Sequence, residues 1–143
     1  MKEDFVSYDI AVKLKEKGYN CELPYAMYNE IGQFCLLTTS APYHVCESGY
    51  KYREYYDYND FDKNDFIAPT ISQVLKWLRK EKKIFVDVNS FPTYSTKEMV
   101  AYAVDVRRNS VGYSMETVES AQSFARWEEA ALAGIECVLN NLI

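Results

Sequence analysis

The stretch APTISQVLKWLRKEKKIFVDV at residues 68–88 predicts a helix followed directly by a strand. Thr70 and Gln73 fit a capping box, in which two side chains bond the unpaired amides of the first helical turn. Four apolar residues then recur at the spacing of one helix face: Ile71, Val74, Leu75 and Leu78. Residues 84–88 are mainly β-branched or aromatic, which favours a strand.

A second strand is predicted over residues 99–106, where Val100, Tyr102, Val104 and Val106 alternate with other side chains. Phe91-Pro92-Thr93 is expected to end the strand before it, because proline cannot donate to a sheet ladder. The two strands therefore predict an antiparallel hairpin.

The last helix is predicted over residues 125–140. Its apolar side consists of Trp127, Ala130, Ala131, Gly134, Ile135, Val138, Leu139 and Leu142. Glycine inside a helix costs about 1 kcal/mol relative to alanine, so we expect Gly134 to serve close packing against a sheet.

Before residue 68, the pattern predicts a helix over residues 7–17 and a hairpin. Ser7 can cap the helix and Gly18 can end it in a left-handed conformation. The strands of the hairpin are expected at residues 25–29 and 33–39, and Gly32 supplies the turn.

The predicted order is α-β-β-(Tyr-rich segment)-α-β-β-α, a single α+β domain spanning residues 1–143. We expect a mainly antiparallel sheet with about three helices packed on it. A length of 143 residues suits one domain. Residues 43–66 and 109–124 are open between strand, loop and helix.

Composition and charge indicate which classes of function the chain is suited to. The formal net charge is −5 and the pI about 4.9, which counts against general affinity for nucleic acid. The N-terminus lacks the apolar run of a secretion signal and no stretch suits a membrane span, so a cytoplasmic location is expected. The irregular spacing of Cys21, Cys35, Cys46 and Cys137 favours thiols over a metal site, and no cofactor or metal is expected.

Common catalytic motifs are absent from the sequence. It contains no glycine-rich dinucleotide or P-loop motif, no HExxH and no GxSxG. His44 is the single histidine, and it could form a nucleophilic site only with a partner that folding brings near. Cys35 and Cys46 are the candidates for that partner. A small enzyme built around His44 is therefore an alternative to a non-enzymatic protein.

The Tyr-rich segment is the most unusual part of the composition. Within residues 47–66, six acidic and three basic residues give a local net charge of −3. Tyrosine combines a large apolar face with a polar tip and is enriched at recognition surfaces. We therefore predict that this surface binds a basic protein partner. The predicted protein-binding residues are Tyr50, Tyr52, Tyr55, Tyr56, Tyr58 and Phe61.

A basic segment at residues 76–83 gives a further alternative. It contains Lys76, Arg79, Lys80, Lys82 and Lys83. These cations could bind nucleic acid weakly while Trp77 stacks on a base. A solvated helix face with cations near its C-terminal end explains the same residues, so nucleic-acid binding is the less favoured function.

Three local patterns together resemble a known group of proteins. They are Ser7-x-x-x-Ala11-x-x-Leu14-Lys15-Glu16-x-Gly18, Ala68-Pro69-Thr70-x-x-x-Val74-x-x-Trp77-Leu78-Arg79 and Trp127-Glu128-Glu129-Ala130-x-x-Ala133-Gly134-Ile135. In this order they resemble short uncharacterised proteins encoded in bacteriophages and mobile elements of Bacteroides-type gut bacteria. The resemblance implies a bacterial or phage intracellular context and carries no catalytic residues. The expected function is accordingly that of an accessory protein that binds another protein.

Overall fold

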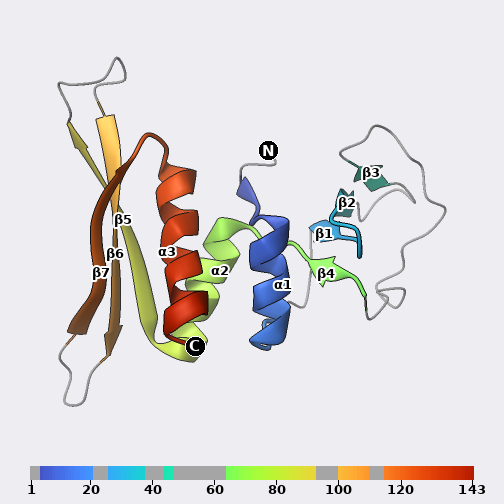
Figure 1. Cartoon of the computed structure of the whole chain (residues 1–143), viewed down its shortest axis with the longest axis horizontal. Helices are drawn as coiled ribbons and strands as arrows, with labels where there is room; N and C mark the ends of the chain where they lie inside the picture. The colour runs from blue at the N-terminus through green and yellow to red at the C-terminus, as the bar shows by residue number, and fades with distance from the viewer. Residues whose placement is uncertain (1–3, 21–25, 38–43, 47–63, 93–99, 110–114) are drawn as a thin grey trace. The chain divides into compact units, whose positions relative to one another are not determined.

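The computed structural model describes residues 4–20, 26–37, 44–46, 64–92, 100–109 and 115–143 (Figure 1). The chain divides into two compact units. We call Phe5–Thr70 the N-terminal unit and Ile71–Ile143, together with Met1–Asp4, the C-terminal unit. The predicted α+β class, with three helices and antiparallel strands, is confirmed. The described strands form two sheets, because each unit pairs its own strands locally.

The N-terminal unit begins with α1 (Tyr8–Glu16) and has a sheet of order β3-β2-β1-β4. Its strands are β1 (Ala26–Tyr28), β2 (Phe34–Leu37), β3 (His44–Cys46) and β4 (Phe66–Ile67). The predicted helix and hairpin are confirmed: Ser7 Oγ accepts from the Ile10 amide at 3.4 Å, and Gly32 turns the chain with φ +81°. Strand β3 lies in the region that the sequence left open, and β4 begins at the last residue of that region.

Aromatic rings fill the interior of the N-terminal unit. Tyr8 meets Tyr28 and Phe66 edge-on with centroids 5.6 Å apart in both pairs. Phe5 contacts Phe34 in the same geometry at 5.3 Å. The Tyr28 hydroxyl, which is buried, donates to the Val6 carbonyl at 2.7 Å. Burial raises the pKa of Tyr28, so this side chain acts as a neutral donor inside the unit.

The C-terminal unit contains α2 (Ile71–Trp77), a π-helical segment η3 (Leu78–Lys82), β5 (Ile84–Pro92), β6 (Val100–Asn109), β7 (Met115–Phe124) and α3 (Trp127–Asn141). The strands form an antiparallel sheet of order β5-β6-β7. The predicted hairpin and last helix are confirmed. Strand β5 is longer than the predicted residues 84–88 and ends at Pro92, within the predicted break at Phe91-Pro92-Thr93. A proline at the end of an edge strand interrupts little of the ladder.

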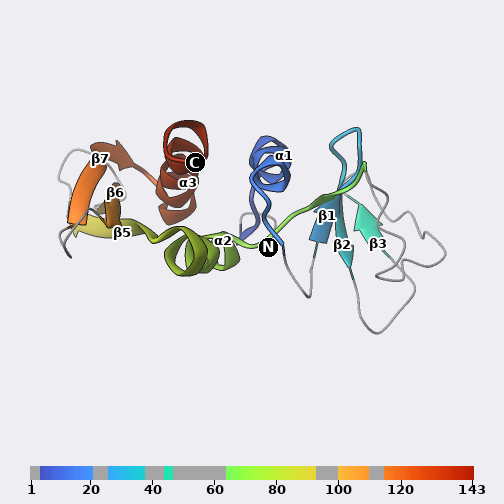
Figure 2. The same ribbon diagram turned by 90° about the horizontal axis from the view of Figure 1, so that it is seen from below.

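Helix α3 packs against one face of this sheet (Figures 1 and 2). The strand residues beneath it include Val86, Val104 and Val106, all buried. Gly134 on α3 lies so close to the sheet that a Cβ atom there would be 2.5 Å from Val86 Cγ1 and 2.7 Å from Val104 Cγ2. The expected packing role of Gly134 is therefore confirmed.

Candidate functional site on the open face of the C-terminal sheet

The sheet of the C-terminal unit has a second face, which points away from α3. We call it the open face. Side chains alternate between the two faces of a strand, so the neighbours of buried Val86 and Val106 lie on the open face. The residue pairs opposite one another on this face of β5 and β6 are Phe85 with Arg107, Asp87 with Asp105, Asn89 with Ala103, and Phe91 with Ala101.

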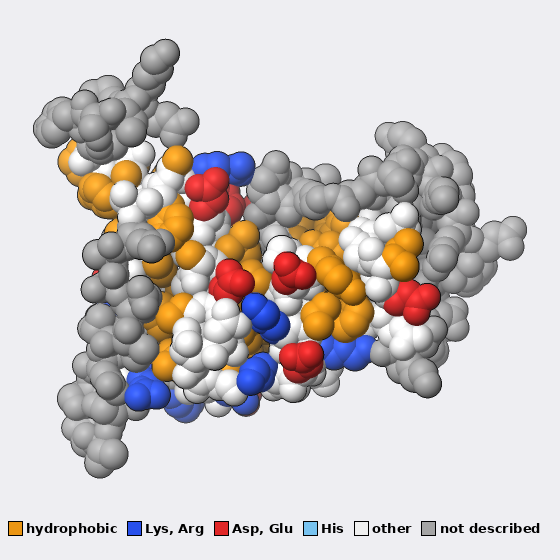
Figure 3. All heavy atoms as spheres, in the orientation of Figure 1, with side chains coloured by type: hydrophobic (Ala, Val, Ile, Leu, Met, Phe, Trp, Pro, Cys, Tyr) orange, Lys and Arg blue, Asp and Glu red, His pale blue; other side chains and the backbone are white. Residues whose placement is uncertain are grey.

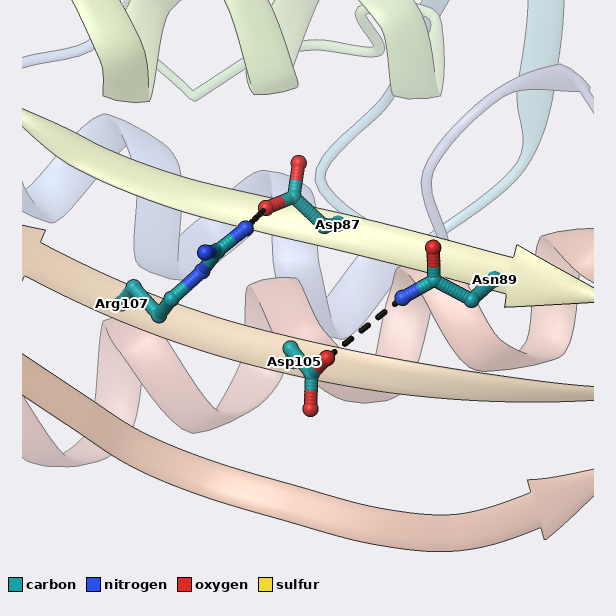
Figure 4. A network of polar contacts seen from close by, with 4 residues as sticks. All are labelled: Asp87, Asn89, Asp105 and Arg107. Atoms are coloured by element: carbon teal, nitrogen blue, oxygen red, sulfur yellow. Dashed lines mark hydrogen bonds and ion pairs between the residues drawn. The ribbon is translucent and has the colours of Figure 1, made fainter.

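Polar side chains form a ladder along the middle of the open face (Figure 4). Arg107 on β6 reaches diagonally to Asp87 on β5 and forms an ion pair with it. Asn89 on β5 reaches the other way and donates to Asp105 Oδ2 at 3.4 Å. The side chains of Arg107 and Asp87 are each 42% exposed, so solvent weakens their attraction. The ladder is thus accessible from outside the unit.

The central pair of the ladder carries like charges. Asp87 and Asp105 are directly opposite one another in the β5-β6 register, an arrangement that destabilises a sheet. Two carboxylates face a single guanidinium, that of Arg107, among these four side chains. These four side chains therefore carry a net charge of −1 at the centre of the open face.

Apolar side chains are exposed at the end of the β5-β6 hairpin. Phe91 is 38% exposed on the open face. Val100 is 40% exposed and lies opposite Pro92 on the other face. Along β5, residues become exposed from Asn89 to Pro92. A single exposed apolar side chain is common on protein surfaces, and Phe91 is the large apolar one exposed on the described part of the open face.

Strand β5 forms an edge of this sheet. Within the described residues it pairs with β6 alone, through nine consecutive residue pairs without a shift in register. The other edge strand, β7, is different because its pairing with β6 has two irregularities. Bulges of this kind twist an edge away from new partners. The regular edge of β5 is thus the better template for an added strand.

The predicted protein-binding residues of the Tyr-rich segment are Tyr50, Tyr52, Tyr55, Tyr56, Tyr58 and Phe61. All of them lie outside the described residues. Their role at a protein-binding surface therefore stays a prediction.

The pairing of β2 with β3 fixes the backbone positions of His44 and of the two candidate cysteines. Cys35 on β2 is directly opposite Cys46 on β3, and Leu37 is opposite His44. Cys35 is buried. In the part of the chain that the structure describes, no group of three or more potential metal-binding side chains occurs. The hypothesis of a catalytic site at His44 also stays a prediction, since the side chains of β3 are outside that part.

The basic segment at residues 76–83 is exposed at all five of its cationic positions. Figure 3 shows Lys and Arg side chains at the lower end of the C-terminal unit. Lys82 Nζ lies 5.4 Å from the centroid of the Trp77 ring, and Lys83 Nζ donates to the Lys80 carbonyl at 2.9 Å. A nucleic-acid base would have to displace Lys82 in order to stack on that face of Trp77.

Comparisons with protein-family models, with curated proteins and with solved structures gave no match to this chain. None of the helices among the described residues is both long and apolar enough to cross a membrane.

Part of the candidate site could have been found from the sequence. The alternation in residues 84–88 and 100–106 could have indicated a hairpin with one apolar and one polar face. The Asp87–Asp105 pair requires the strand register, which the sequence pattern leaves undefined.

Proposed function

We propose that this protein is a non-enzymatic accessory protein, of phage or mobile-element type, that works inside the cell by binding another protein. The observation that supports a binding function best is the open face, where exposed Phe91 lies on the same strand as acidic Asp87. Apolar anchors surrounded by polar groups are the usual composition of a binding surface. The irregular cysteine spacing favours the intracellular location.

The Tyr-rich segment is a second, separate binding surface in this proposal. Its local charge of −3 has the same sign as the centre of the open face. Both surfaces would therefore suit a partner with basic residues. Tyrosine and phenylalanine supply contact area at low cost in side-chain entropy.

Affinity capture from the native host, followed by mass spectrometry, tests the proposed function. The tagged wild-type chain is compared with Phe91→Ser and with the double variant Tyr55→Ala/Tyr56→Ala. Ile31→Ser is the matched control, because Ile31 is also a large exposed apolar side chain, at 71%, but belongs to the N-terminal unit.

We expect one protein to be enriched reproducibly by the wild type and by the Ile31 variant, and to be lost with Phe91→Ser. Reduced recovery with the tyrosine variant would support the Tyr-rich segment as a second binding surface. Equal recovery by all four chains would contradict the proposed binding surfaces.

Nucleic-acid binding through the basic segment is the second candidate function. The five exposed cations at residues 76–83 favour it. Such binding depends on counterion release and predicts retention on DNA or RNA that falls steeply with added salt. Absence of retention at low salt would eliminate this candidate.

A further inference from the structure

We propose that the partner adds an extended strand with alternating basic and apolar residues to the outer edge of β5. This inference rests on the proposed protein-binding function and names the partner's chemistry. Strand addition uses main-chain hydrogen bonds for affinity and alternate side chains for specificity.

The edge of β5 has the length and regularity that strand addition needs. Residues 84–92 pair in uninterrupted register with β6 on one side, and in the described sheet no strand lies on the other side. Edge strands are usually protected by lysine, proline or a bulge. In β5 those features lie at its ends, since Lys83 precedes the strand and Pro92 closes it.

The negative charge on the open face favours basic residues in the partner's strand. A strand beside β5 would bring its outward side chains next to Phe85, Asp87 and Asn89, since neighbouring strands present side chains to the same faces. Asp87 already lies opposite Asp105, so an acidic residue from the partner would add a third negative charge. A lysine or arginine there reduces the repulsion and can extend its methylene stem along Phe85.

The opposite face of β5 favours apolar residues at the alternate positions of the partner's strand. Ile84 and Val86 are buried on that face, with 3% and 6% exposure, and α3 packs against it. The alternate residues of an added strand would extend this apolar surface. Together, the two faces define a partner segment in which apolar and basic residues alternate.

Titration of the ¹⁵N-labelled full-length chain with the synthetic peptide acetyl-KVKVKVK-amide tests this inference by NMR. The first control peptide, EVEVEVE, reverses the charge. The second is KVKVKVK with every backbone amide N-methylated, which keeps the side chains and removes the hydrogen-bond donors. We expect the unmodified basic peptide to shift the amide signals of residues 84–91 and to bind at least tenfold more tightly than either control.

The variant Asp87→Asn should weaken binding of the basic peptide by about two- to fivefold, the range of an exposed ion pair. Equal binding of the N-methylated peptide, binding of the acidic peptide, or shifts confined to other residues would each overturn strand addition at β5. If the basic peptide does not bind but a partner is still captured in a Phe91-dependent way, strand addition is rejected and the proposed function is retained. Capture that is independent of Phe91 would instead contradict the open face itself.

Discussion

Gly134 shows how one missing side chain permits α3 to approach its sheet. Replacing it with alanine would gain about 1 kcal/mol in helix propensity. The new methyl group, however, would lie 2.5 Å from Val86 Cγ1 and 2.7 Å from Val104 Cγ2, and overpacking a core typically costs about 1–3 kcal/mol. Since the two effects partly cancel, we expect Gly134→Ala to lower the free energy of unfolding by up to about 2 kcal/mol in urea denaturation.

The control for this prediction is the double variant Val86→Ala/Gly134→Ala. Val86→Ala removes the methyl group closest to the new one, so the two substitutions should couple favourably. Additive losses in the double-mutant cycle would show that contact with Val86 is unimportant.

Lys83 is the described non-glycine residue with a positive φ, at 57°. The left-handed conformation costs an L-residue about 1–2 kcal/mol, and a β-branched side chain tolerates it poorly. We expect Lys83→Gly to raise the free energy of unfolding by up to about 1 kcal/mol. Lys83→Val should lower it by about 1 kcal/mol. Equal thermal midpoints for the glycine and valine variants would contradict this explanation.

At the scale of elements, Tyr28 joins β1 to the segment before α1. Its buried hydroxyl donates to Val6. Tyr28→Phe would leave that buried carbonyl without this donor and should cost about 1–2 kcal/mol at neutral pH. Urea denaturation of wild type and variant measures this difference.

The same tyrosine predicts a dependence on pH. Burial raises the pKa of Tyr28 above its ordinary value of 10.0, so the unfolded chain loses this proton at a lower pH than the folded chain does. The stabilisation is therefore complete below about pH 10 and declines as the pH rises through the pKa of the folded state. The stability difference between wild type and Tyr28→Phe should narrow above pH 10. A constant difference from pH 8 to pH 11.5 would contradict this linkage.

In the hairpin of β5 and β6, we expect one substitution to stabilise the fold and to weaken peptide binding. Asp105→Asn removes the like-charge pair with Asp87 and keeps a similar shape. We expect it to raise the free energy of unfolding by about 0.2–1 kcal/mol while weakening binding of the basic peptide. Loss of stability in this variant would show that Asp105 contributes mainly to the fold.

The helices and the longest hairpin could be predicted from sequence because their apolar residues recur over many positions. Val74 and Leu78, for example, define one face of the helix that ends in η3, and both are buried. Strands β3 and β4 contain three and two residues, too few for a period to be visible. Strand β7 contains the largely polar sequence METVESAQSF, which has weak strand propensity and depends on pairing with β6.

At the scale of the whole chain, the division into two compact units falls between Thr70 and Ile71. The sequence there contains a helix-capping pattern and no glycine- or serine-rich linker, so composition offers no indication of a division. The candidate site is also a property of the folded chain. Asp87 and Asp105 are 18 residues apart in sequence and become neighbours only through the β5-β6 register.

The central claim is that this protein binds a partner through β5 and the open face. Amide hydrogen–deuterium exchange of the full chain, alone and with the captured partner, tests it most directly. The account predicts slower exchange within residues 84–91 in the complex, since new main-chain hydrogen bonds would protect the outer edge of β5. Unchanged exchange at residues 84–91, with protection confined to other segments such as residues 50–61, would contradict it.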